Sequence, residues 1–390
     1  MMKLLVIRFL LVGEMLHAGP ILRDFKSIAS RGHRVVGVFP VLRKTPEDNG
    51  EGFSIDAVVL QRFLPMLSYL EFCLRAMTRI IKRHRNAQAM IFETDEYPLA
   101  VPWLLRRVLT NGRSPVIVFR DSDPFLGTHG VRTLYRSLLR EFSLRLSRFA
   151  DVVFAISPLH AKDIGGRYGT SPERLHVWPS AVDTELFNPC KYANDRNRVR
   201  KELGIGDSFL IMHHGWLEKE RGLRELLEAM RIVHDTNTDI SLLLLGKGPD
   251  KEKLRALADS YGLNGTVIFR DPVPHQDVPR LIAAADAGVH PLPDKPQWVV
   301  QTPTKVLEYL SMRKPVVVTD IAANRWIVEN RPVAFFCGRG SPKEIAQAIL
   351  QCARTGAEIP ESERDRIAAR FSADRVADRV LMIIEKARPS

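Results

Sequence analysis

The sequence predicts an α/β protein built from two doubly wound domains, each with a parallel sheet covered by helices. Three observations lead to this prediction. The chain has 390 residues, more than one ordinary domain contains. Short apolar runs alternate with segments of helical periodicity along the chain. These runs are almost continuously apolar, which is typical of parallel strands buried on both faces.

The first half contains expected strands at 3–12, 34–39, 88–92, 115–119 and 151–157, with helices between most of them. The first run carries Arg8, and no small-residue cleavage site follows it. We therefore expect a buried strand there rather than a signal peptide. No run reaches the ~20 apolar residues that a membrane-spanning helix requires.

The second half repeats the alternation more regularly. We expect strands at 209–213, 241–245, 266–269, 287–290, 315–319 and 333–337. The segments between them have helical length and an apolar stripe, and a last helix is expected over about 373–387. A breaker at Phe187-Asn188-Pro189 and the polar segment that follows predict a linker over 188–205.

Composition excludes several classes of protein. Hydrophobic residues make up 45% and charged residues 26%, which excludes a disordered chain, a collagen-like repeat and a coiled-coil rod. The four cysteines are far apart and form no CxxC pair, which argues against a zinc ribbon or a disulfide framework. Free thiols fit a reducing compartment, so we expect a cytoplasmic protein.

The net charge of +12 is unevenly distributed. Residues 72–149 hold 14 basic and 6 acidic residues, an excess of +8. Two segments there have helical periodicity, and basic residues recur on one face of each: Arg75, Arg79, Lys82 and Arg83, then Arg132, Arg136 and Arg140. We expect the opposite, apolar stripes to face the core: Leu74, Met77, Ile80 and Ile81, then Leu134, Leu138, Leu139, Phe142, Leu146 and Phe149.

Two interpretations of the basic faces stay open. They are the solvated faces of ordinary surface helices, or they form a patch that contacts anionic lipid headgroups, at the inner face of a membrane, or a polyanionic substrate. We expect no nucleic-acid partner, because the sequence has no zinc finger, RRM signature or aromatic ladder.

In doubly wound sheets ligands bind outside the carboxyl ends of the strands, so the loops there are informative. After the strand ending near His214, the segment Gly215-Trp216 begins a loop that reaches Arg221 just before a helix. A glycine lets the backbone approach a ligand, and a helix start favours an anion. The loop fits a phosphate clamp as well as a turn with a solvated arginine. Gly246-Lys247-Gly248 is a weaker signal, because it lacks the full dinucleotide fingerprint.

The most informative segment is 301–310. Thr302 suits the N-cap and Pro303 the first helical position. The amide groups of Thr304 and Lys305 would then form a site for a diphosphate, with the Lys305 ammonium adding charge. Glu308 lies one turn later and would accept hydrogen bonds from ribose or sugar hydroxyls. The alternative is a surface ion pair between Lys305 and Glu308.

In the order in which they occur, seven stretches resemble the group 1 glycosyltransferases, the retaining family numbered 4, which has the two-domain GT-B fold. They are ADVVFAISPLHAKDI, VWPSAVDTELFNP, HGWLEKERGLRELLEAM, LLLLGKGPDKEKLRALADSYGL, VIFRDPVPHQDVPRLIAAADAGVHPLP, TPTKVLEYLSMRKPVVVTD and FSADRVADRV. The resemblance extends from about 148 to 388, and the first 147 residues resemble the family only in outline.

The resemblance implies two Rossmann-like domains, 1–187 and 206–372, with a cleft between them, and a last helix, 373–390, that returns to the first. A nucleotide-diphosphate sugar would bind the second domain and a glycan or lipid-linked acceptor the first. Arg221 and Lys305 would contact the donor diphosphate, Glu308 would hold the donor, and no metal or other cofactor would be required. We expect Gly215, Trp216, Gly246, Gly248, Thr302 and Thr304 to line the donor site, with Gly13 from the first domain.

Three positions depart from the family pattern. Val300 stands where the family often has a first glutamate, so backbone N–H groups around Gln297–Gln301 are expected to replace it. Trp216 stands where arginine is frequent, and Ser180-Ala181 replaces Asn-Gly. These departures keep two alternatives open: a catalytically weak sugar-nucleotide-binding scaffold, and a sugar-nucleotide epimerase.

On the acceptor side, Asp121 and Asp123 follow the strand PVIVFR, and Asp95 lies in a second acidic loop. A carboxylate there would orient or deprotonate an acceptor hydroxyl. The competing interpretation of Asp121 and Asp123 is a capped turn.

Overall fold

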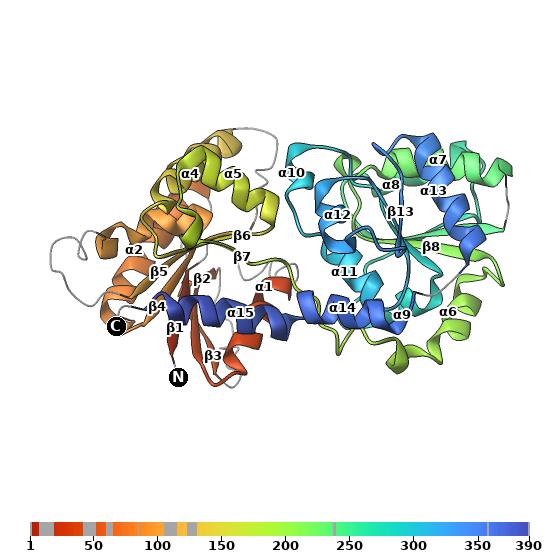
Figure 1. Cartoon of the computed structure of the whole chain (residues 1–390). Coiled ribbons are helices and arrows are strands. Elements are labelled where there is room, and N and C mark those ends of the chain that lie inside the picture. Colours follow the sequence, from red (N-terminus) through yellow and green to blue (C-terminus); the bar gives the residue numbers. More distant parts are fainter. Residues whose placement is uncertain are drawn as a thin grey trace. The chain divides into compact units, whose positions relative to one another are not determined.

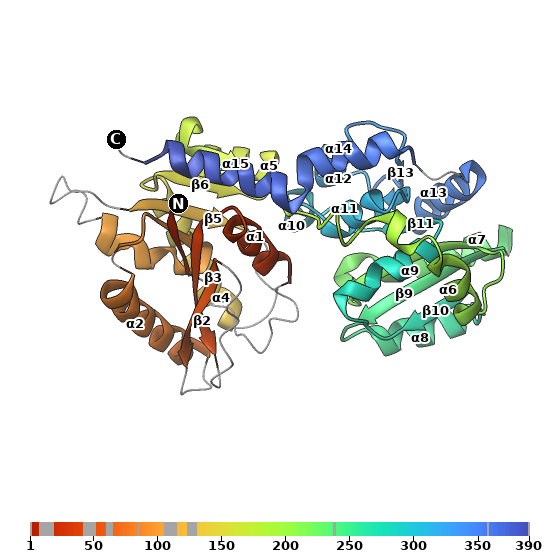
Figure 2. The ribbon, with the colours of Figure 1, turned by 90° about the horizontal axis from the view of Figure 1, so that it is seen from below.

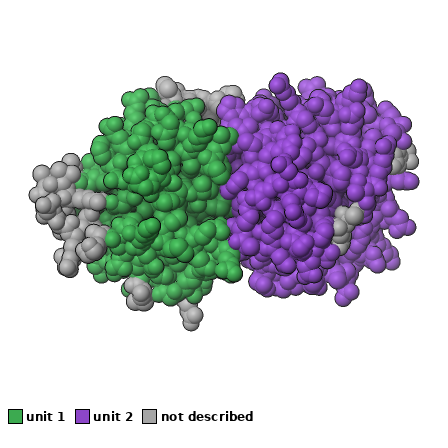
Figure 3. Space-filling view, viewed as in Figure 1, with its two compact units in different colours: residues 1–180, 373–390 green, residues 181–372 purple. Residues whose placement is uncertain are grey.

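The structure is a computed structural model that describes residues 2–7, 19–41, 52–59, 65–84, 86–104, 115–122, 131–236, 239–356 and 359–388. Contacts divide the chain into two compact units (Figures 1 and 3). Unit 1 comprises Met1–Ser180 with Ala373–Ser390, and unit 2 comprises Ala181–Ser372. Each contains a parallel sheet with helices on its faces, which confirms the predicted fold class.

Within the described residues, the sheet of unit 1 has seven parallel strands in the order β3-β2-β1-β4-β5-β6-β7. They are β1 (Lys3–Ile7), β2 (Arg34–Val41), β3 (Phe53–Val59), β4 (Ala89–Glu93), β5 (Val116–Asp121), β6 (Val152–Ala155) and β7 (Leu175–Val177). The sequence analysis missed β3 and β7. Asp56 interrupts the apolar run of β3, but its carboxylate is paired with Arg79 and His84 and so can lie within a strand.

Helices cover unit 1: α1 (Gly19–Ala29), α2 (Pro65–Arg83), α4 (Val131–Ser147), α5 (Pro158–Tyr168) and α15 (Ala373–Lys386), with the 3-10 segments η2 (Thr94–Ala100) and η3 (Pro172–Arg174). The last helix, α15, lies beside α1 (Figure 1). Ser27 Oγ donates to Asp374 at 2.9 Å, and Arg31 forms ion pairs with Asp374 and Asp378. These contacts attach the end of the chain to the unit with which it began.

The exposed faces of α2 and α4 differ from the expectation. Of the side chains expected to face the core, Ile80 is buried and Met77 and Leu146 pack against the core. Five others are largely exposed: Leu74 (72%), Ile81 (54%), Leu138 (64%), Phe142 (52%) and Phe149 (51%). The inward face of α4 carries small and polar side chains instead, because Arg140 turns inward to Asp121. The predicted apolar stripes are therefore confirmed for Ile80, Met77 and Leu146 and wrong for the five exposed side chains.

The sheet of unit 2 has the order β10-β9-β8-β11-β12-β13, and all its pairs are parallel. Its strands are β8 (Phe209–Trp216), β9 (Ile240–Lys247), β10 (Val267–Arg270), β11 (Ala287–His290), β12 (Val316–Val318) and β13 (Ala334–Phe336). The expected strands of this half are confirmed, because near-continuous apolar runs between helices are a strong signal of a buried parallel sheet.

Two helical layers enclose that sheet. One contains α6 (Asp195–Leu203), α9 (Val278–Ala284), α11 (Thr304–Ser311) and α14 (Glu361–Phe371), and the other contains α7 (Leu223–Thr236), α8 (Lys251–Ser260) and α13 (Pro342–Thr355). Figure 2 shows α8 and α9 on opposite sides of β9. Shorter helices complete the unit: α10 (Pro296–Val299), α12 (Ala322–Val328), η4 (Pro189–Tyr192), η5 (Lys219–Arg221) and η6 (His275–Asp277).

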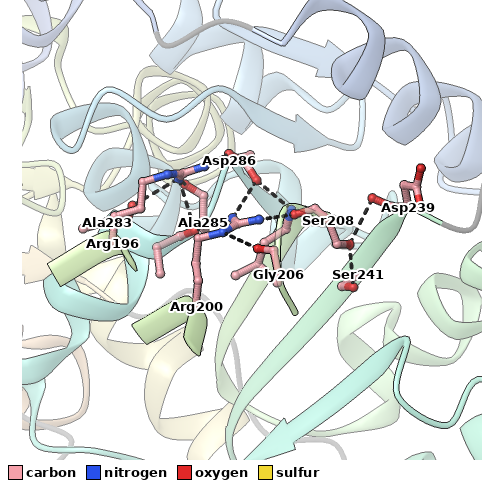
Figure 4. Close-up of polar contacts among 11 residues, drawn as sticks. Arg196, Arg200, Gly206, Ser208, Asp239, Ser241, Ala283, Ala285 and Asp286 are labelled. Atoms are coloured by element: carbon pink, nitrogen blue, oxygen red, sulfur yellow. Dashed lines mark hydrogen bonds and ion pairs between the residues drawn. The ribbon is translucent and has the colours of Figure 1, made fainter. Parts of the chain in front are cut away.

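The predicted linker over 188–205 is wrong. The chain passes from unit 1 to unit 2 at 180/181, and the segment contains η4 and α6, which pack within unit 2. Arg196 and Arg200 turn from α6 toward Asp286 and pair with its two carboxylate oxygens at 2.5 and 3.2 Å (Figure 4). Arg200 also donates to the carbonyl of Ala284 at 3.0 Å. The charges that suggest a solvated linker are therefore satisfied inside the fold.

We predict that Arg200→Leu lowers the free energy of unfolding of unit 2 by about 2–3 kcal/mol, because it leaves part of the Asp286 carboxylate without its partner. Urea denaturation measures this change. Arg198 provides the matched control, since it lies on the same helix and pairs with Asp195 in solvent. Arg198→Leu should cost less than about 0.5 kcal/mol, and equal losses in the two variants would contradict the assignment.

Candidate functional site

The topology of unit 2 places a crevice at the carboxyl ends of β8 and β11. These neighbouring strands lie at the point where the strand order reverses, which is where doubly wound sheets bind ligands. β8 ends with His214, Gly215 and Trp216, and β11 ends with His290. The helix α11, which carries Lys305 and Glu308, begins after the loop that follows β11.

Lys305 lies directly against the backbone of Gly215. A Cβ atom built on Gly215 would be 2.5 Å from Lys305 Cε and 2.9 Å from Lys305 Nζ. Gly215 also has φ +124°, a conformation that side chains rarely adopt. The backbone conformation thus favours glycine here, and the missing side chain leaves room for the end of the Lys305 side chain.

The ammonium group of Lys305 is electrostatically unsatisfied. Burial, followed by the nearby positive charge of Arg221, lowers the pKa of Lys305 to about 8, against the opposing effect of Glu308 and Glu218. Within the described residues, Lys305 Nζ forms no ion pair with either carboxylate. Two cations held together at a strand end favour the binding of an anion, because it would offset both charges.

The guanidinium group of Arg221 is held in place by two contacts. Its Nε donates to Glu218 Oε1 at 2.9 Å, and its Cζ lies 5.1 Å from the centre of the Trp298 ring. Trp298, on α10, donates its indole N–H to the carbonyl of Glu220 at 3.2 Å. Sequence reasoning missed Trp298, which is 77 positions from Arg221 and belongs to no recognised spacing.

Glu308 accepts hydrogen bonds on both carboxylate oxygens. His214 Nε2 lies 2.7 Å from Oε2, and His275 Nε2 lies 3.2 Å from Oε1. Burial alone would raise the pKa of Glu308, but these hydrogen bonds hold it well below its usual range. The predicted alternative, a surface pair with Lys305, is wrong, because the partners of Glu308 are histidines and its side chain is buried.

Two further histidines lie buried near the cations. His213 and His290 stack with ring centres 5.8 Å apart, and His213 Nδ1 lies 3.1 Å from the carbonyl of Val289. That carbonyl requires a proton on Nδ1, so His213 Nε2 is an acceptor. Within the described residues, His213 Nε2 and His290 Nδ1 have no hydrogen-bond partner. Burial, then the charge of Lys305, places the pKa of each ring well below its usual value.

Gly246 and Gly248 lie in close backbone contact with β8 and the loop that follows it, and their place in a donor site stays a prediction. A Cβ on Gly246 would be 1.8 Å from the carbonyl oxygen of Gly215, and one on Gly248 would be 2.1 Å from that of Leu217. Both glycines therefore let the end of β9 and the following turn approach β8, so their role is to pack backbone against backbone.

The other expected donor-site residues lie around the same strand end and helix start. Trp216 is the last residue of β8, and 38% of its surface is exposed. Thr302 is buried and is not the N-cap, since Pro303 occupies the cap position and α11 begins at Thr304. The helix has no side-chain cap hydrogen bond there.

The backbone of 297–301 does not replace the missing glutamate. The amide groups of Val300 and Gln301 both donate to the carbonyl of Trp298, and that of Val299 donates to Lys295. These donors are used within the turn around α10. The expectation that this segment supplies N–H groups to a donor is therefore wrong for these three residues.

In unit 1, Asp121 is completely buried and fully partnered. Its carboxylate forms an ion pair with Arg140 at 2.5 Å, lies 3.1 Å from His160 Nε2 and accepts from Thr94 at 2.7 Å. Burial opposes ionisation, but Arg140 and His160 hold the pKa of Asp121 well below its usual range. Asp121 therefore does not fit the predicted role as an acceptor base. Gly13 and Asp123 lie outside the described residues, and so does the side chain of Asp95.

Three general features concern the described residues. No group of three or more histidine, cysteine or acidic side chains there has an arrangement that would hold a metal ion. None of the helices combines the length and hydrophobicity needed to cross a bilayer. The four cysteines are free thiols.

Two family models match the chain. The model described as Glycosyl transferases group 1 matches residues 208–355, and the model described as Glycosyltransferase Family 4 matches residues 26–186. The first match includes the cationic strand end of β8 and the start of α11.

Among curated relatives, the chain is 29% identical over 147 residues to a GDP-mannose-dependent alpha-(1-6)-phosphatidylinositol monomannoside mannosyltransferase of Mycolicibacterium smegmatis, covering 38% of each chain. It is 21% identical over 251 residues to an alpha-D-kanosaminyltransferase of Streptomyces kanamyceticus, covering 64% of this chain and 63% of that one. The matches thus span less than two thirds of these relatives' lengths. Among solved structures, HepE of Anabaena in complex with UDP has a TM-score of 0.75 at 17% identity, with 99% of this chain and 100% of that chain covered.

The buried histidines predict a pH-dependent stability. Since the pKa values of His213 and His290 are lowered in the folded state, the unfolded chain binds more protons below its histidine pKa of about 6.5. The melting temperature should be constant from that pH to about pH 8, where Lys305 begins to titrate, and should fall between about pH 6.5 and 5. Each ring contributes up to about 1.4 kcal/mol per pH unit to the free energy of unfolding in the acid range. Melting curves across this range measure the slope.

The double variant His213→Leu/His290→Leu should flatten this slope. The control His234→Gln changes a histidine that lies partly exposed on α7, outside the buried pair, and should leave the slope unchanged. A double variant with the original slope would show that other groups cause the acid sensitivity.

Proposed function

Since the chain belongs to the group 1 glycosyltransferases and has their GT-B fold, we propose that it transfers a sugar from a nucleotide-diphosphate sugar to an acceptor hydroxyl, with retention of the anomeric configuration. The observation that carries this proposal is the pair of cations, Arg221 and Lys305, at the carboxyl end of β8 and the start of α11. The acceptor is a glycan or a lipid-linked sugar, and the enzyme works in glycan, polysaccharide or glycolipid biosynthesis on the cytoplasmic side of a membrane.

Charge on the leaving diphosphate is the main electrostatic problem of this reaction. The bond between the anomeric carbon and the diphosphate oxygen breaks, the acceptor oxygen bonds to that carbon, and the proton of the acceptor hydroxyl passes to the departing diphosphate oxygen. Lys305, Arg221 and the first-turn amides of α11 stabilise the negative charge as it develops. These groups take the place of a metal ion. Glu308 accepts a hydrogen bond from a hydroxyl group of the donor.

A scaffold that binds sugar nucleotides without transfer is the second candidate, because Val300 stands where the family often has a glutamate. Transfer of radiolabelled sugar, or hydrolysis of the donor, separates the two candidates. Product NMR then reports the anomeric configuration. An epimerase would instead convert the donor into its stereoisomer without any acceptor.

The donor site predicts a specific pattern in a thermal-shift screen against UDP, GDP, ADP, TDP and their common sugars. One nucleotide class should raise the melting temperature of the native chain by mass action. Arg221→Ala and Lys305→Ala should abolish that shift and lower kcat/KM by about 10²-fold or more.

Lys247→Ala serves as the control, since Lys247 is an exposed cation at the end of the neighbouring strand β9. It should keep the shift. No shift with any nucleotide in the native chain, or equal losses in all three variants, would contradict the proposed site.

We also propose that unit 1 contacts an anionic membrane through the α2/α4 surface, defined by Leu74, Ile81, Leu138, Phe142 and Phe149. These apolar side chains are all more than half exposed. Exposed cations lie on the same two helices, where the side chains of Arg83 and Arg145 are 65% and 72% exposed, and Arg148 lies over the Phe149 ring. Exposed apolar groups together with flanking cations are typical of surfaces that insert into an anionic lipid interface.

Sedimentation with vesicles of phosphatidylglycerol and phosphatidylcholine tests this surface. Binding should require the anionic lipid and weaken as salt rises. The double variant Leu138→Asp/Phe142→Asp should reduce the bound fraction about tenfold, because it removes apolar area and adds negative charge. Met382→Asp alters an equally exposed apolar residue on α15 and should bind normally. Binding that ignores lipid charge or salt would rule the surface out.

A further inference from the structure

A chain of hydrogen bonds connects the backbone of β8 to the carboxylate of Glu308. Tyr309 Oη lies 2.6 Å from the carbonyl oxygen of Met212 and 2.8 Å from His214 Nδ1. His214 Nε2 in turn lies 2.7 Å from Glu308 Oε2. The rings of His214 and Tyr309 meet edge to face, with centres 5.1 Å apart. The imidazole is thus fixed at both of its nitrogens.

Proton accounting fixes the tautomer of His214. An ionised carboxylate can only accept hydrogen bonds, so the contact with Glu308 requires a proton on His214 Nε2. Burial lowers the pKa of His214 despite the attraction of Glu308, so the ring is neutral and its Nδ1 carries no proton. The single hydroxyl proton of Tyr309 is then directed either to this Nδ1 or to the carbonyl of Met212. The protein therefore presents one donor, Nε2–H, to one oxygen of Glu308.

The two oxygens of Glu308 have unequal partners. The inner contact, from Oε2 to His214, is short, and the His214 side chain is 9% exposed. The outer contact, from Oε1 to His275, is 3.2 Å long, and the His275 side chain is 53% exposed. His275 lies on the single turn of η6, where its ring packs against Phe187. A hydroxyl group from solvent can replace the outer partner far more readily than the inner one.

We propose that His214 is a positioning residue of the donor site. Its hydrogen bond holds Glu308 Oε2 toward the protein interior, so that Oε1 faces the ligand. Glu308 Oε1 then accepts a hydrogen bond from one hydroxyl group of the bound nucleotide sugar. This hydroxyl group displaces His275 from Oε1. The assignment rests on the proposed function, since it concerns how the same site recognises its donor.

The strand itself supplies a matched control. His213 precedes His214 on β8 and is equally buried, but its ring bonds to the backbone carbonyl of Val289 and touches neither Glu308 nor Tyr309. If His214 only filled space, replacing either ring by phenylalanine would change stability alone. If His214 orients Glu308, only His214→Phe changes recognition of the donor.

The experiment measures donor kinetics in the full chain for His214→Phe, His214→Gln and His213→Phe. His214→Phe should raise the KM of the nucleotide sugar about 10- to 100-fold, the range for losing a hydrogen bond to a charged group, and change kcat by less than about threefold. His214→Gln should restore most of the loss, because its amide can donate to Oε2. His213→Phe should leave KM unchanged.

Binding of simpler anions identifies the part of the donor concerned. Calorimetry of His214→Phe should show weaker binding of the nucleoside diphosphate and unchanged binding of pyrophosphate, which has no hydroxyl for Glu308. If the nucleoside diphosphate is unaffected and only the nucleotide sugar binds more weakly, Oε1 serves the sugar rather than the ribose, and the positioning role stands.

Nitrogen NMR of the native chain provides a readout independent of activity. His214 should be the neutral tautomer with its proton on Nε2. A proton on Nδ1 alone, or a KM for His214→Phe equal to that of the native chain, would overturn the positioning role. Failure of the native chain to bind any nucleoside diphosphate would instead overturn the proposed function, on which this assignment rests.

Discussion

The site of unit 2 depends on the close approach of Lys305 to the bare Cα atom of Gly215. This contact brings a second cation to the strand end where Arg221 lies, and it needs space that side chains would fill. Two further glycines avoid steric clashes with backbone carbonyls. A Cβ atom on Gly246 would clash with the carbonyl of Gly215, and one on Gly222 would lie 2.1 Å from the carbonyl oxygen of Pro291. The glycines around β8 are thus explained by backbone packing that gathers positive charge at one point.

The electrostatic balance of individual groups separates the proposed binding residues from structural ones. Asp121 and Asp286 are charged, but each has several partners that satisfy it inside its own unit. Lys305 differs, because its strongest neighbour is another cation and its ionised form is disfavoured. Glu308 lies between these cases, with one firm and one exchangeable partner. A group whose charge is only partly compensated in the free protein is the one that gains most from a ligand.

Sequence reasoning could predict the strands of unit 2 and the positions of Arg221, Lys305 and Glu308, because loops that follow buried parallel strands are local features of the chain. It could not predict their partners. His214 and Glu308 are 94 positions apart in the sequence, and Trp298 and Arg221 are also far apart in the sequence and meet only in the folded chain. The same limit explains the errors at Asp121 and at 188–205: a charged residue looks solvated in a sequence until a distant counter-charge, such as Arg140 or Asp286, is known.

The two departures from the family pattern in unit 2 oppose each other in charge. Trp216 removes a cation that the family often has after Gly215, and Val300 removes an anion, so the net charge of the motif is unchanged. Either change alone would alter the attraction for a diphosphate, whereas both together preserve it. With Val300 in place of a glutamate, the turn around α10 supplies no carboxylate at this position. It instead provides Trp298, whose ring and indole N–H hold η5 and the remaining arginine, Arg221, in place.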